Sequence, residues 1–118
     1  MSAAENRRRS QRIQPFVAPC RYVVAEERVA GFLTDLSREG GRVTTDAEPP
    51  PVATPIVVEL RVPRQPLALR LPATVRWKGP SERGGFVFGV SFDRAGADER
   101  KALEALVDDF LRRAASIV

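Results

Sequence analysis

Apolar and polar residues alternate along much of the chain between residues 16 and 92, which is the period expected of half-buried β-strands. The first alternating segment runs from Phe16 to Val24, and the second ends at Leu36. We expect Glu26 and Glu27 to form the hairpin tip between them. On the second segment the expected core face carries alternate residues, namely Ala30, Phe32, Thr34 and Leu36.

Further segments of strand character follow, separated by turns and loops rich in glycine or proline. Residues 46–55 contain four prolines and are predicted to form a loop. Pro72 is expected to interrupt its strand as a bulge or bend. The predicted strands are Gly41–Thr45, Ile56–Val62, Leu67–Trp77 and Phe86–Phe92.

After these strands the apolar period changes from two to that of an α-helix, predicted over residues 98–115 with Asp98 as its N-cap. The connections between strands are too short for parallel crossovers, so the strands are expected to pair antiparallel. The sequence therefore predicts an all-β fold with one C-terminal helix: a six-stranded antiparallel β-barrel whose helix covers one opening. Residues 13–118 are expected to form this single domain, and residues 1–12 a flexible N-terminal arm.

The composition removes several kinds of chemistry from consideration. The 118 residues include no histidine and one cysteine, so Ser-His-Asp and Cys-His catalysis, histidine-ligated zinc and cysteine cages are excluded. Cys20 lies on the expected core face and is predicted to be an inert buried thiol. We predict a protein that is not an enzyme and has no metal or cofactor. With no run of eighteen apolar residues and no signal peptide, we expect a cytoplasmic protein without a membrane span.

The formal net charge of +4 is concentrated at the N-terminus. Residues 1–12 hold four arginines and one glutamate, a net charge of +3, which leaves +1 for residues 13–118. Seventeen of the nineteen basic residues are arginine, the side chain suited to bidentate contacts with phosphates and guanine edges. An anionic ligand near the N-terminal arm is therefore predicted.

Two short segments could carry such binding. Before the first strand, Arg8 and Arg12 are four residues apart, with Arg7 beside them. At the end of the second strand, Asp35 and Ser37 are two residues apart, so both side chains are expected to leave the face opposite Phe32 and Leu36. Gly40 permits the positive φ that a tight turn can require. A carboxylate can accept the N1 and N2 hydrogens of guanine, while arginines bind its O6 and N7 or a phosphate.

At these residues the sequence resembles the PilZ domain, a bacterial receptor for cyclic di-GMP. Arg8-Arg9-Ser10-Gln11-Arg12 is similar to the family's RxxxR motif, and Asp35-Leu36-Ser37-Arg38-Glu39-Gly40 to its [D/N]xSxxG motif. The resemblance implies ligand binding without turnover. It makes Arg8 and Arg12 the principal clamp and Arg7 an accessory contact. It also makes Asp35 the acceptor for guanine, Ser37 a polar contact, and Gly40 the residue that shapes the turn.

The resemblance further implies a cyclic di-GMP effector whose arm orders over the ligand and changes the surface offered to an unidentified downstream protein. Motility, pilus function and exopolysaccharide production are the processes in which the family acts. The alternatives are a protein-interaction module that does not depend on ligand and a small nucleic-acid-binding barrel, although no specific nucleic acid is expected. We expect a monomer or weak homodimer. Trp77 could be a packing residue or stack on a base, and Gly89 could admit either the helix or a ligand.

Overall fold

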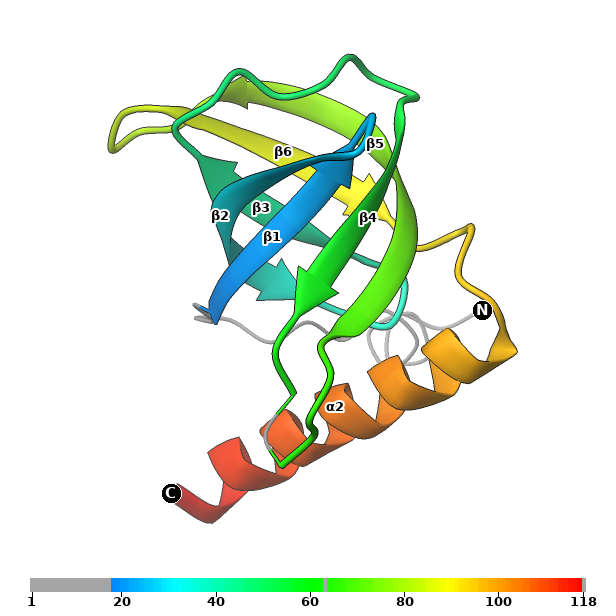
Figure 1. Cartoon of the computed structure of the whole chain (residues 1–118). Helices are drawn as coiled ribbons and strands as arrows, with labels where there is room; N and C mark the ends of the chain where they lie inside the picture. Colours follow the sequence, from blue (N-terminus) through cyan, green and yellow to red (C-terminus); the bar gives the residue numbers. More distant parts are fainter. Residues whose placement is uncertain (1–17, 63, 118) are drawn as a thin grey trace, which may run out of the picture.

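The computed structural model describes residues 18–62 and 64–117, which form a β-barrel with a helix lying across one end (Figure 1). The predicted arm, residues 1–12, lies outside the described residues, so the predicted division of the chain into arm and domain remains a prediction. The elements are β1 (Ala18–Val24), β2 (Glu27–Leu36), β3 (Gly40–Thr45), β4 (Pro55–Leu60), β5 (Leu69–Pro80), β6 (Phe86–Ser91) and α2 (Ala97–Ile117).

The six described strands form one closed sheet in the order β1-β2-β3-β6-β5-β4, and each neighbouring pair is antiparallel. Closure comes from β1, which pairs with β2 on one side and with β4 on the other. In this ring, β1 and β4 lie on the opposite side of the barrel from β3 and β6. The predicted fold class, an antiparallel six-stranded barrel with a C-terminal helix, is confirmed.

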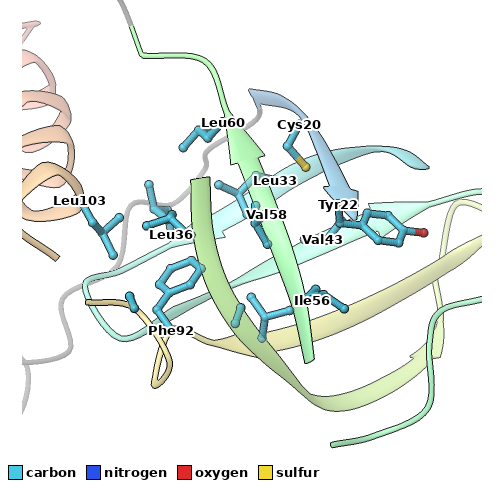
Figure 2. Close-up of a cluster of buried hydrophobic side chains, with 14 of the residues drawn as sticks. Cys20, Tyr22, Leu33, Leu36, Val43, Ile56, Val58, Leu60, Phe92 and Leu103 are labelled. Atoms are coloured by element: carbon cyan, nitrogen blue, oxygen red, sulfur yellow. The ribbon is translucent and has the colours of Figure 1, made fainter. Parts of the chain in front are cut away.

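Apolar residues from every strand fill the interior, and Figure 2 shows part of this cluster. Tyr22 and Phe88 pack edge to face, with ring centroids 5.0 Å apart. The Tyr22 hydroxyl donates to Thr45 Oγ1 over 3.1 Å, so its polar atom is satisfied inside the barrel. Cys20 is buried among these residues, and burial raises the pKa of its thiol to about 11, as expected for an unreactive thiol.

The helix α2 closes one opening of the barrel with its apolar face. Leu103, Leu106 and Val107 are buried and belong to the same hydrophobic cluster as the strands. The helix begins at Ala97, so Asp98 lies inside its first turn and the predicted N-cap is wrong. Gly96 precedes the helix instead, and its backbone N–H donates to Glu99 Oε1 over 3.4 Å, as in one half of a capping box.

The predicted core face of β2 is wrong over most of its length. Gly31 and Leu33 are buried, whereas Phe32 is 51% exposed. Cys20 of β1 faces the core and is paired with Gly31, which fixes the inward face at odd-numbered positions. A β-bulge between Leu33 and Asp35 then shifts the alternation, and Leu36 is buried as predicted.

Two further local predictions are corrected. The β1–β2 hairpin tip lies at Ala25 and Glu26, both with positive φ, and Glu27 already pairs with Val24. Pro72 causes no bulge: it stands in regular register opposite Val57. It fits there because the pairing of β5 with β6 starts only at Thr74, so β4 is its strand partner. The irregularity in β5 lies between Val75 and Trp77.

Candidate ligand-binding site

The segment that carries the second motif forms a tight turn between β2 and β3. Ser37 is central to it: its N–H donates to the Gly40 carbonyl over 2.9 Å, and its hydroxyl donates to the same carbonyl over 3.2 Å. The hydroxyl also accepts the N–H groups of Glu39 and Gly40, each over 3.2 Å. A hydroxyl has one hydrogen to donate and two lone pairs, so these bonds fill its capacity.

The predicted placement of Asp35 and Ser37 on an outward face is wrong, because both are buried, with exposed fractions of 1% and 0%. Asp35 continues the inward, odd-numbered face of Gly31 and Leu33, and the bulge between Leu33 and Asp35 brings Leu36 inward as well. The motif turn is therefore inserted into the end of the barrel. It is tied to the residue directly after β6, since the Phe92 N–H donates to the Glu39 carbonyl over 2.8 Å.

Gly40 is required for a different reason from the one predicted. The glycines with positive φ are Gly84 and Gly85, whereas Gly40 lies against β6, where a Cβ would overlap the Val90 carbonyl oxygen. Backbone atoms cannot move aside as a flexible side chain can, so only glycine fits this crossing.

Beside the turn, β3, β5 and β6 enclose a shallow surface hollow of about 290 Å³. Its walls consist of the backbone of three glycines together with charged and aromatic side chains. The lining residues are Glu39, Gly40, Gly41, Arg42, Arg76, Trp77, Gly89, Val90 and Ser91.

Trp77 forms one wall of this hollow. Its indole lies against Gly89, at a position that a Cβ there would overlap, and the side chain is 43% exposed. The guanidinium carbon of Arg42 stands 5.7 Å from the centre of the Trp77 ring, within the range of a cation–π contact. Trp77 is therefore not a core residue, and Gly89 admits this indole in place of the helix or a ligand.

Arg76 is fixed next to Trp77 by an acidic partner. Its guanidinium NH2 contacts Asp93 Oδ2 at 2.6 Å, and Asp93 Oδ1 accepts the Thr74 hydroxyl over 3.0 Å. The β5 irregularity between Val75 and Trp77 leaves Arg76 and Trp77 both exposed at consecutive positions. Two arginines and an exposed aromatic face thus converge on the hollow, which suits a ligand that combines negative charge with a planar ring.

The motif turn also contacts the helix, since Arg38 NH2 lies 2.7 Å from Asp108 Oδ1 on α2. Within the described part of the chain, no group of three or more His, Cys, Asp or Glu side chains could hold a metal ion. No described helix is long and apolar enough to cross a membrane.

The structure brings Asp35, Ser37 and Gly40 together, whereas the predicted clamp residues, Arg7, Arg8 and Arg12, lie outside the described residues. The sequence reasoning missed Arg42 and Arg76. The sequence does not decide whether Trp77 is a packing residue or stacks on a base. One sequence signal could have indicated this group: Arg76 and Trp77 stand at predicted strand positions, and Gly89 stands on another predicted strand.

A sequence model of the PilZ domain matches residues 6–109. The chain belongs to the PilZ domain family. Comparison with curated proteins finds no significant match.

Solved structures share the PilZ fold at low sequence identity. The PilZ domain of CeSA from a cellulose-synthesizing bacterium is 21% identical, with a TM-score of 0.67 over 85% of this chain and 97% of that one. The Bacillus subtilis inhibitor of motility, MotI/DgrA, is 16% identical, with a TM-score of 0.70 over 89% of this chain and 50% of that one.

Escherichia coli YcgR, solved in complex with c-di-GMP, is 19% identical, with a TM-score of 0.71 over 93% of this chain and 48% of that one. The PilZ domain described here thus spans about half the length of the last two proteins.

Proposed function

We propose that this PilZ domain binds cyclic di-GMP in the hollow beside the Ser37 turn and reports the bound state to a partner protein. The observation that carries the proposal is the convergence of Trp77, Arg42 and Arg76 on a hollow next to the [D/N]xSxxG turn. Membership of the PilZ family and the fold shared with YcgR, which was solved with c-di-GMP, support the same ligand.

The chemistry of the ligand matches the groups around the hollow. Cyclic di-GMP offers two phosphates to arginine side chains and two guanines whose faces can stack on an indole. Arg42 and Arg76 supply positive charge from β3 and β5, and Trp77 supplies the stacking surface. In this proposal Arg8 and Arg12 clamp the ligand from the N-terminal side, and Arg7 adds a further contact.

Within the motif turn we assign different roles to the two polar residues. Asp35 is the guanine acceptor, and Gly40 allows the close crossing of the turn over β6. Ser37 acts mainly as a positioning residue, because its hydroxyl already makes three hydrogen bonds within the turn. Binding occurs without turnover and without a cofactor, in the cytoplasm, and serves a process such as motility, pilus function or exopolysaccharide production.

Calorimetric titration with cyclic di-GMP tests the proposal on the full-length protein. We expect a dissociation constant near the micromolar range, which corresponds to a binding free energy of about −8 kcal/mol and suits a reversible sensor. Arg8→Ala should weaken binding about 30- to 1000-fold, the loss of charge-assisted contacts worth roughly 2–4 kcal/mol. Trp77→Ala should weaken it about 5- to 150-fold, as for the loss of one base–aromatic stack.

Arg83→Ala is the matched control, because Arg83 is an exposed arginine in the β5–β6 turn and does not line the hollow. Its affinity should equal that of the unmodified protein. Absence of binding to the unmodified protein would reject the ligand. Unchanged affinity in Arg8→Ala or Trp77→Ala would reject the site while leaving the ligand in place.

A further inference from the structure

The outer face of β1 and β4, across the barrel from the hollow, carries a group of arginines around one carboxylate. Arg21 of β1 is paired in register with Glu59 of β4, and Glu59 with Arg70 of β5. Arg28 reaches the same carboxylate from β2, and Arg61 directly follows β4. We call these four arginines and Glu59 the β1–β4 arginine face.

Glu59 is fully engaged by two of the four arginines. Its Oε1 lies 3.0 Å from Arg28 Nε, and its Oε2 lies 2.9 Å from Arg70 NH1. The bond from Arg28 and the nearby arginine charges lower the pKa of Glu59, whose side chain is only 12% exposed. Glu59 therefore remains ionised at neutral pH, and one negative charge is left to balance four positive ones.

Arg21 and Arg61 are exposed and form no ion pair with any of the residues that the structure describes. They line a surface hollow of about 410 Å³ together with Pro19, Cys20, Glu59 and Ala68. Two guanidinium groups of like charge beside one hollow repel each other, so an added carboxylate between them would be favourable.

The surroundings of this hollow indicate which kind of anion fits. Val23 and Val57, paired across β1 and β4, are half-buried beside the arginines, and Phe32 stands 51% exposed opposite Pro19. Arginine with a few apolar and aromatic anchors is the composition enriched at protein interfaces. A single-stranded nucleic acid needs a row of stacking aromatics, and the described outward positions of β1 and β4 hold none.

We propose that the β1–β4 arginine face docks an acidic segment of a partner protein, with a partner carboxylate seated between Arg21 and Arg61 and an apolar side chain against Phe32. This contact is separate from the nucleotide site, because none of the residues that line the hollow of Arg21 and Arg61 lines the hollow beside the Ser37 turn. It holds whether or not cyclic di-GMP is the ligand.

The test uses a short fluorescein-labelled peptide in which glutamate alternates with valine and serine. Fluorescence anisotropy measures its binding to the full chain at physiological salt, and amide NMR shifts locate it. We expect binding that shifts the resonances of Arg21, Glu59 and Arg61, and that weakens as salt is raised. The Arg21→Ala/Arg61→Ala variant should lose at least tenfold in affinity. The same peptide with glutamine in place of glutamate should lose affinity to a similar extent.

Two controls keep the outcome decisive. Arg83→Ala/Arg94→Ala removes two exposed arginines outside the face and should change affinity less than twofold. Arg21→Lys/Arg61→Lys keeps the charge but loses the forked geometry, and should lie between the alanine variant and the unmodified protein. Failure of the peptide to bind, unchanged affinity in the alanine variant, or tighter Arg21-dependent binding of a single-stranded DNA of equal charge would each overturn the proposal.

Discussion

The indole of Trp77 occupies the space in which a side chain at Gly89 would lie. The two residues are directly paired on β5 and β6, so the indole rests on the backbone of the neighbouring strand, and the Arg42 guanidinium carbon lies 5.7 Å from the ring centre. This arrangement holds the indole at the surface of the barrel, 43% exposed and next to the motif turn.

Gly89→Ala should therefore displace the indole. A tryptophan side chain can rotate away, so we expect a moderate loss of about 1 kcal/mol in the free energy of unfolding. Because the chain has one tryptophan, its fluorescence emission reports the displacement directly. Cyclic di-GMP affinity should fall as in Trp77→Ala. Unchanged emission would show that the indole does not rest on Gly89.

Gly40→Ala should cost more, because the obstructing atom is a backbone carbonyl of Val90. We expect a loss of about 2–3 kcal/mol in the free energy of unfolding, measured by urea denaturation. Gly79→Ala is the matched control on β5, since nothing lies within 4 Å of the added Cβ. Its effect should stay within about 0.5 kcal/mol, and equal effects of the two substitutions would contradict the crossing geometry.

Ser37→Ala should destabilise the turn as well as weaken ligand binding. The substitution leaves the buried N–H group of Gly40 and the part-buried N–H group of Glu39 without the acceptor they use, which costs about 1–3 kcal/mol. Thermal unfolding without ligand measures this loss. Ser81→Ala, in the turn between β5 and β6, should change stability by less than about 0.5 kcal/mol. A Ser37→Ala protein of full stability would indicate that the hydroxyl serves the ligand alone.

The β1–β2 hairpin offers a stabilising substitution. Ala25 and Glu26 have φ values of 50° and 70°, a conformation that favours asparagine and glycine. Ala25→Asn/Glu26→Gly should raise the free energy of unfolding by about 0.5–1.5 kcal/mol, measured by urea denaturation. Ala25→Val should lower it, because a β-branched residue is strained at positive φ. The opposite order of stabilities would contradict this turn.

The buried thiol of Cys20 should make stability fall at alkaline pH. Burial raises its pKa from 9.0 to about 11, so between these values the folded protein keeps a proton that the unfolded chain has lost. The free energy of unfolding should therefore decrease as pH rises through this interval, by up to about 3 kcal/mol.

The difference between the unmodified protein and Cys20→Ala isolates this effect, because burial also raises the pKa of Tyr22 and that residue is common to both. Urea denaturation at pH values between 8 and 11 gives the free energy of unfolding as a function of pH. This free energy should fall more steeply with pH in the unmodified protein than in Cys20→Ala. Parallel pH dependence in the two proteins would contradict the raised thiol pKa.

The sequence was sufficient to predict the strands, the helix and the barrel, because turn residues and apolar periods mark each element locally. It was insufficient for the face of β2, where Ala30 and Phe32 are as apolar as Gly31 and Leu33. The pairing of Gly31 with Cys20 on β1, together with the bulge before Asp35, decides that face, and neither is visible in the hydrophobic pattern.

The candidate site, too, could be predicted from the sequence only in part. The motif turn around Ser37 could be identified because its residues are contiguous. The grouping of Arg42 with Trp77 depends on β6 being inserted between β3 and β5, a tertiary feature with no local signal. The roles of Arg7, Arg8 and Arg12 remain predictions from the sequence.

The pairing of β1 with β4 also limits how other chains can engage this domain. In an open sheet the outermost strands present unpaired backbone groups to which a foreign peptide can add as an extra strand. Here each described strand already has a neighbour on both flanks. A partner must therefore recognise side chains on the barrel surface. Substitutions of these side chains can change which partner binds without changing the barrel itself.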